Sequence, residues 1–101
     1  VPRAPAYCAS KAGIILLKKS LASESASHNI QVNAIAPHYL ETELTEGLRS
    51  SEKIFNGLVR QIPLERFAKT AEIMDLVLLM STEASSYMTG TAIPVDGGYL
   101  A

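Results

Sequence analysis

Residues 6–37, AYCASKAGIILLKKSLASESASHNIQVNAIAP, combine a long helical segment with a short apolar segment that ends at a proline. The first part, about residues 6–26, contains no proline and is rich in Ala, Leu, Ile, Lys and Ser, which favours a helix. Its apolar side chains cover most of the helix circumference, so we expect neighbouring elements on several of its sides. The second part, about residues 30–36, is typical of a buried strand that stops at Pro37.

Further elements are expected along the rest of the chain. Residues 43–61 contain two short helical segments, and Thr70 is placed to cap a helix over about residues 71–80. A last strand is predicted over about residues 91–95, and the Gly97–Gly98 pair after it favours a tight turn with positive φ. The order of helix, strand, helices and strand predicts an α/β fold with a parallel sheet, whose opening strands are absent from the chain.

Composition narrows the classes of protein to which the chain can belong. Its 101 residues are 48% hydrophobic and 19% charged, which is ordinary for one globular domain or part of one. A net charge of −1 argues against a nucleic-acid or anionic-membrane partner, because both require basic patches. Apolar runs fall far short of the roughly 18 residues of a membrane span. The single cysteine and the lack of a secretory leader predict a cytoplasmic protein, and the absent initiator Met predicts a piece of a longer chain.

Tyr7 and Lys11 are the first candidates for chemistry. They are four positions apart, so on a helix both side chains lie on one face, one turn apart. A free phenol releases its proton only near about pH 10, and a neighbouring ammonium favours the phenolate, which suits a general acid and base. The spacing alone leaves a second interpretation open, in which a half-buried Tyr7 lies beside a solvated Lys11 and neither has a catalytic role.

The residues around this pair resemble a known family. Tyr7-Cys8-Ala9-Ser10-Lys11-Ala12-Gly13 is similar to the active-site helix of the short-chain dehydrogenases/reductases. The similarity continues in order and at matching spacings through residues 29–37 with Thr42, and through residues 62–67, 71–73, 87–90 and 95–98. The resemblance implies the C-terminal half of a Rossmann-like, doubly wound parallel-sheet domain, with the N-terminal cofactor-binding half absent.

The resemblance also implies an activity, the interconversion of an alcohol and a ketone with NAD or NADP. In such an enzyme Tyr7 exchanges a proton with the substrate oxygen, while Lys11 favours the phenolate and hydrogen-bonds the nicotinamide ribose. Two roles for one ammonium are reasonable because it carries three donors. Residues 37–44 and 66–67 resemble both 3-oxoacyl-thioester reductases and sugar or polyol dehydrogenases, so the small-molecule substrate stays open.

The loop after the first strand is the second implied site. Pro37, His38, Leu40 and Thr42 fall in a segment similar to the family's Pro-Gly-x-x-x-Thr loop, where the backbone at Leu40 meets the nicotinamide carboxamide. The hydroxyl of Thr42 is expected to contact the carboxamide or the pyrophosphate, and residues 43–61 correspond to a substrate lid. His38 stands where the family has glycine, and we expect either a solvent-facing side chain or a polar group in the pocket.

Parts of the family's site are absent from the chain. Its glycine-rich cofactor loop, its Asn-Ala-Gly segment and its catalytic Ser all precede the Tyr, so the missing N-terminal half of the enzyme is an expected partner, together with homodimer or homotetramer formation. The alternative is a non-catalytic fragment or degenerate paralogue that serves subunit association. Cys8, His28 and Asp96 are interpreted as a small core residue, a helix-end residue and a turn former, and no metal site is predicted.

Overall fold

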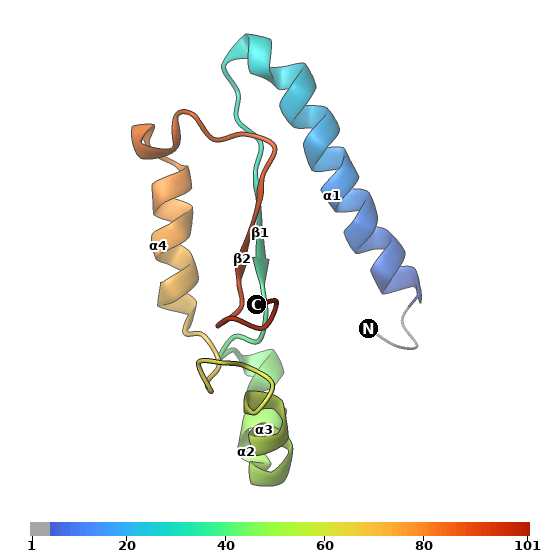
Figure 1. The fold of residues 1–101 in the computed structure, drawn as a ribbon, viewed down its shortest axis with the longest axis vertical. Coiled ribbons are helices and arrows are strands. Elements are labelled where there is room, and N and C mark those ends of the chain that lie inside the picture. The colour runs from blue at the N-terminus through green and yellow to red at the C-terminus, as the bar shows by residue number, and fades with distance from the viewer. Residues whose placement is uncertain (1–4) are drawn as a thin grey trace. The chain divides into compact units, whose positions relative to one another are not determined.

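The longest element is helix α1, Pro5–Ser25, which opens the part of the chain that the computed structural model describes, residues 5–101 (Figure 1). The sequence predicted this helix over about residues 6–26. A short 3-10 turn, η1 (Ala26–His28), follows it, and Asn29 then adopts a left-handed conformation with φ of 57°. The N–H of Asn29 donates to the carbonyl of Ala26 at 3.0 Å. Asparagine tolerates this conformation better than most residues, which explains why the helical segment ends here.

Two parallel strands, β1 (Ala34–Pro37) and β2 (Ala92–Val95), form the sheet of the described residues (Figure 1). The N–H of Ala34 donates to the carbonyl of Thr91 at 2.9 Å, and the N–H of His38 donates to that of Val95 at 3.1 Å. Equal steps of four residues along both strands define a parallel register. The mixed α/β architecture with a parallel sheet confirms that part of the predicted fold class.

Strand β1 is shorter than the predicted segment over residues 30–36, and side chains explain the difference. The N–H of Val32 donates to the hydroxyl oxygen of Thr89 rather than to a backbone carbonyl, at 3.1 Å. The side-chain amide of Asn33 donates to the carbonyl of Met88 at 3.1 Å and accepts from the N–H of Thr91 at 3.2 Å. Residues 31–33 are therefore extended and fixed, but they do not join a regular ladder.

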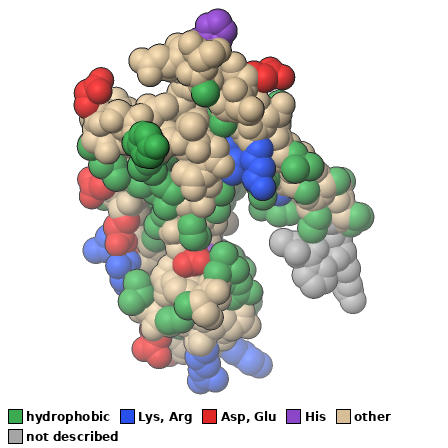
Figure 2. All heavy atoms as spheres, turned by 45° about the horizontal axis from the view of Figure 1, so that its top comes forward, with side chains coloured by type: hydrophobic (Ala, Val, Ile, Leu, Met, Phe, Trp, Pro, Cys, Tyr) green, Lys and Arg blue, Asp and Glu red, His purple; other side chains and the backbone are tan. Residues whose placement is uncertain are grey.

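The chain divides into two units, of which the first contains the residues up to Ile35 and Ser86–Ile93. In α1 only Lys18 and Ala22 are buried, and a Cβ on Gly90 would lie 3.5 Å from that of Ala22. The other apolar side chains of the helix are exposed, and hydrophobic side chains reach its surface in Figure 2. These exposed side chains are Ile14, Ile15, Leu16, Leu17 and Leu21. The expected cover on several sides of this helix is not provided by the described residues.

The second unit contains Ala36–Ser85 and Pro94–Ala101. Its elements are η2 (Glu43–Thr45), α2 (Glu46–Ser50), α3 (Glu52–Val59), α4 (Thr70–Met80) and η3 (Glu83–Ser85). Phe67 is 1% exposed and stacks on Tyr39 at 4.9 Å between ring centroids. The ring of Phe55, in α3, is tilted against that of Phe67 at 5.2 Å. This aromatic group is the core of the second unit.

Helix α4 begins one residue earlier than the sequence predicted. Thr70 is its first helical residue and not its N-cap, so that prediction is wrong by one position. Lys69 occupies the cap, and its N–H donates to the carboxylate of Glu72 at 2.9 Å. The side chain of Lys69 has no acceptor, so the carboxylate of Glu72 in the first turn accepts from the N–H of Lys69 instead.

The turn after β2 requires its glycines. Gly97 has a φ of 62°, and a Cβ there would lie 2.6 Å from the Cγ2 of Ile62. Gly98 has a φ of 93°, which side chains rarely adopt. The predicted positive φ at this pair is thus confirmed. No helix among residues 5–101 is both long and apolar enough to cross a membrane.

Candidate active site

Tyr7 and Lys11 lie in the first turns of α1, on one exposed face. The phenol of Tyr7 is 53% exposed, and the Nζ of Lys11 lies over its ring at 5.4 Å from the centroid. At this distance an ammonium is attracted to the face of the ring, which keeps the two side chains together. No carboxylate of the described residues forms an ion pair with Lys11, so its donors are available to another group.

The loop predicted to meet a cofactor lies in the second unit. Leu40 forms an isolated parallel bridge with Ala68, in which the N–H of Glu41 donates to the carbonyl of Ala68 at 2.8 Å. The N–H of Ala68 in turn donates to the carbonyl of Tyr39 at 3.0 Å. The N–H and carbonyl of Leu40 therefore point away from Ala68. The carbonyl accepts from the hydroxyl of Thr45, and the N–H has no acceptor among the described residues.

Thr42 is held from the helical segment that follows it. Its N–H donates to the hydroxyl oxygen of Thr45 at 3.0 Å, and its carbonyl accepts from the Nη2 of Arg49 at 2.9 Å. This bond holds the guanidinium of Arg49, whose Nε is buried and has no partner among the described residues. Thr45 and Arg49 were not among the residues predicted from the sequence. They follow Thr42, the N-cap of η2, by three and seven residues, a spacing that brings both side chains back toward a cap residue.

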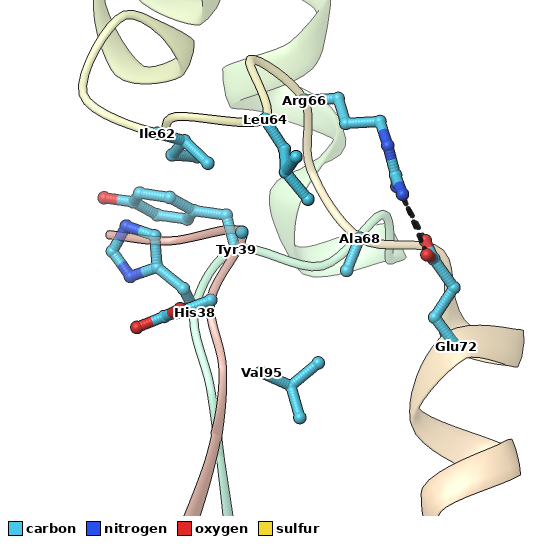
Figure 3. A pocket seen from close by; sticks show the side chains of 10 residues that line it. His38, Tyr39, Ile62, Leu64, Arg66, Ala68, Glu72 and Val95 are labelled. Atoms are coloured by element: carbon cyan, nitrogen blue, oxygen red, sulfur yellow. Dashed lines mark hydrogen bonds and ion pairs between the residues drawn. The ribbon is translucent and has the colours of Figure 1, made fainter. Parts of the chain in front are cut away.

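His38 is half-buried and contacts two aromatic rings. Its imidazole stacks on the ring of Tyr99 at 4.1 Å with 19° between the planes, and lies against Tyr39 at 4.5 Å. His38 and Tyr39 border a cavity of about 80 Å³, and Figure 3 shows their rings side by side. The other lining residues are Ile62, Leu64, Arg66, Ala68, Glu72, Val95, Asp96 and Gly97.

Arg66 and Glu72 close one side of this cavity with a bidentate ion pair (Figure 3). The two nitrogen–oxygen distances are 2.7 and 2.8 Å. The hydrogen bond from Arg66, followed by that from the N–H of Lys69, lowers the pKa of Glu72 from its ordinary 4.5 to about 2. The same carboxylate raises the pKa of Arg66. Both groups are therefore occupied with each other, and the pair links the loop before α4 to the start of that helix.

Each unit contains polar groups of the kind that a nicotinamide cofactor requires. Lys11 has free donors for a ribose hydroxyl, and the N–H of Leu40 is a free donor for a carboxamide oxygen. Lys11 belongs to the first unit and Leu40 to the second. Tyr7 and Lys11 are brought together in the first unit, and Pro37, His38, Leu40 and Thr42 in the second. Among residues 5–101 no His, Cys, Asp or Glu side chains gather in a group that could hold a metal.

An α/β chain with a loop at the carboxyl end of a parallel strand belongs to the class in which ligands bind at that edge of the sheet. A family model described as enoyl-(acyl carrier protein) reductase matches residues 1–100. The chain thus belongs to the short-chain dehydrogenase/reductase family, which confirms the resemblance in its sequence.

Individual relatives carry different names. The chain is 46% identical over 92 residues to a 3-oxoacyl-(acyl-carrier-protein) reductase of Thermotoga maritima, covering 91% of the chain and 37% of that protein. It is 40% identical over 99 residues to the 2-dehydro-3-deoxy-D-gluconate 5-dehydrogenase of Escherichia coli, covering 98% of the chain and 39% of that protein. The chain spans well under half the length of these relatives.

Solved structures show the same similarity. A putative 2-deoxy-D-gluconate 3-dehydrogenase from Agrobacterium tumefaciens with bound NADP superimposes with a TM-score of 0.90 at 40% identity. The match covers 95% of this chain and 39% of that one. The described fold is therefore the fold of part of a Rossmann-type dehydrogenase.

Proposed function

We propose that this chain is the C-terminal part of an NAD- or NADP-dependent oxidoreductase that interconverts an alcohol and a ketone. The observation that carries the proposal is the Nζ of Lys11 held 5.4 Å from the ring centroid of Tyr7, on an exposed face of α1. Family membership, and a relative's structure that contains NADP, support the cofactor. The chain covers less than two fifths of the length of each of these two relatives, which supports the existence of a further, N-terminal part.

In this proposal Tyr7 moves the proton. When an alcohol is oxidised, its hydroxyl proton passes to the phenolate oxygen of Tyr7, and when a ketone is reduced, the phenol returns that proton to the forming alkoxide. A bound nicotinamide cofactor supplies or accepts the hydride. Lys11 favours the phenolate by its positive charge and donates to the ribose, while the N–H of Leu40 donates to the carboxamide.

The exposed apolar face of α1 supports the need for further protein. The exposed apolar side chains of α1 are explained if an N-terminal part and a second copy of the chain cover this helix. The same N-terminal part would supply the glycine loop and the serine of the family's site. The alternative function, subunit association without catalysis, uses the same face but assigns no role to Tyr7 or Lys11. The two functions are distinguished by activity.

The test uses a fusion protein in which residues 1–101 replace the aligned part of the Escherichia coli relative, behind that protein's own N-terminal part. We expect turnover with NAD or NADP on a 2-dehydro-3-deoxy sugar acid or a 3-oxoacyl thioester. Tyr7→Phe should lower turnover by at least about a hundredfold, within the range of general acid–base catalysis, and leave cofactor binding nearly unchanged. Lys11→Ala should lower both turnover and cofactor affinity.

Matched controls come from the same helix. Lys19→Ala removes an exposed lysine of α1 two turns further on and should leave turnover and cofactor affinity unchanged. A Tyr7→Phe variant within tenfold of the parent would contradict the proposal. A fusion protein that folds and associates but has no turnover with either substrate class favours the association function.

A further inference from the structure

The imidazole of His38 is part of a continuous aromatic row in the second unit. It stacks on Tyr99 with 4.1 Å between centroids and contacts Tyr39 at 4.5 Å, and Tyr39 stacks on the buried Phe67. Offset and tilted ring pairs at such distances are favourable beyond the area that they bury. His38 therefore links the loop over residues 37–42 to the turn that follows β2.

Tyr99 is presented to His38 by a turn with many internal hydrogen bonds. The carboxylate of Asp96 accepts from the N–H of Gly98 at 3.0 Å and from that of Leu100 at 3.2 Å, which confirms the predicted role of Asp96 as a turn former. The N–H of Tyr99 donates to the carbonyl of Asp96 at 3.1 Å, and the carbonyl of Gly97 accepts from Leu64. The ring of Tyr99 thus projects from a rigid support.

The backbone of His38 does not require glycine. Among the described non-glycine residues only Asn29 and Glu65 have a positive φ, so His38 lies in a region that any residue adopts. Its N–H extends the parallel ladder by donating to the carbonyl of Val95 at 3.1 Å. A glycine here keeps this hydrogen bond but loses every ring contact, and it allows the loop more conformations.

We propose that His38 is a positioning residue, whose stack on Tyr99 fixes the loop over residues 37–42 so that the backbone of Leu40 and Thr42 is ordered before the nicotinamide of NAD or NADP binds. This inference rests on the proposed function for its cofactor, but not for the ordering itself. The cavity beside His38, at about 80 Å³, is too small for a dinucleotide, so His38 acts through the loop. A loop ordered in advance binds its ligand at a lower entropic cost.

Amide hydrogen exchange without cofactor tests the ordering in the fusion protein. In His38→Gly and in Tyr99→Ala, amides over residues 38–42 should exchange roughly two to ten times faster, the range that one aromatic pair contributes. Amides of α4 should exchange at the parental rate. A general loss of stability would accelerate exchange in α4 as well as over residues 38–42, so α4 serves as the internal control. His38→Phe retains the stack and should protect the loop as the parent does.

Fluorescence titration with NADH and NADPH tests the consequence for binding. We expect His38→Gly and Tyr99→Ala each to weaken cofactor binding by roughly two- to tenfold, and the double variant to be no weaker than either, because both changes remove one interaction. His38→Phe should bind within about twofold of the parent. Tyr87→Ala is the control, because Tyr87 is a fully exposed tyrosine of the other unit.

The outcomes separate this inference from the proposed function. Unchanged exchange over residues 38–42 in both single variants, or additive losses in the double variant, overturns the inference. A parent fusion protein that is folded but binds neither nucleotide overturns the proposed function, and the exchange experiment still decides whether His38 orders the loop. Should that fusion fail to fold, the same variants behind the N-terminal part of the Thermotoga maritima relative give the answer.

Discussion

At the scale of single residues, the ion pair between Arg66 and Glu72 makes the second unit sensitive to acid. The pKa of Glu72 is lowered to about 2 in the folded chain, against an ordinary 4.5. A lowered carboxyl pKa means that the folded state favours the ionised form, so the contribution to stability is present above about pH 4.5. It is lost as the pH falls from there through about 2.

Glu72→Gln tests this prediction in the fusion protein. We expect the variant to melt at a lower temperature than the parent at pH 6, and the difference to shrink between about pH 4.5 and 2. Arg66→Met should remove the same pH dependence, since it removes the largest cause of the lowered pKa. Melting curves whose separation stays constant down to about pH 3 would contradict the prediction. Both side chains are largely exposed, so solvent keeps the effect small.

Sequence patterns predicted single residues well where the cause was local. The positive φ of Gly97 and the turn-forming role of Asp96 depend on neighbours within a few positions, and both were predicted. The surroundings of His38 depend on Tyr99, far along the chain, and no local pattern indicates that two such rings stack. The expectation of a polar group in a pocket agrees with the cavity that His38 lines, but the stack on Tyr99 was not predicted.

At the scale of elements, the loop over residues 37–42 is hydrogen-bonded to η2 and α2, which begin the proposed substrate lid over residues 43–61. The hydroxyl of Thr45 donates to the carbonyl of Leu40 and accepts from the N–H of Thr42, while Arg49 donates to the carbonyl of Thr42. The lid cannot shift at this end without breaking bonds to the loop. We propose that residues 43–61 select the substrate and that the loop binds the cofactor, and these two roles are then predicted to be coupled.

Thr45→Val tests that coupling. The substitution keeps the shape of the side chain and removes the hydrogen bonds to the Leu40 carbonyl and from the Thr42 N–H. At about 0.5–1.5 kcal/mol each, the free energy of unfolding should fall by about 1–3 kcal/mol. We expect faster amide exchange over residues 40–42 and a higher KM for both cofactor and substrate. Thr45→Ser retains the hydroxyl and should restore the parental values. A change in substrate KM alone would show that the lid moves independently of the loop.

The order of elements was predictable from the sequence because helix composition, apolar runs and glycine pairs are local patterns. The length of β1 was not, because the hydrogen bonds of residues 31–33 go to Met88, Thr89 and their neighbours instead of a regular ladder. Those partners lie more than fifty positions away. The start of α4 was missed by one residue because the cap is completed by Glu72 and not by a threonine.

At the scale of the whole molecule, the uncovered apolar surface of α1 predicts that residues 1–101 do not fold stably alone. Each large apolar side chain left in water forfeits about 1.5–3 kcal/mol, while net stabilities of domains are about 5–15 kcal/mol. Five such side chains on α1 alone are exposed. Expressed by itself, the chain should show weak near-ultraviolet dichroism, no cooperative melt and no turnover.

Addition of the N-terminal part of a relative as a separate polypeptide should restore a cooperative melt and cofactor-dependent turnover. The control is the same addition to a chain with Leu17→Glu, which places a charge on the apolar face of α1 and should prevent the two pieces from assembling. A sharp melt of the isolated chain as a monomer with turnover would contradict the prediction.

The pairing of β1 with β2 also sets an order of events during synthesis. Ala34 of β1 finds its partner Thr91 57 positions later, so this part of the sheet has to wait for most of the chain to emerge from the ribosome. At about 5–20 residues per second the wait is about 3–11 seconds. A helix forms within about a microsecond, so α1 precedes this pairing, and the edge of β1 that pairs with β2 is open to wrong partners throughout that interval.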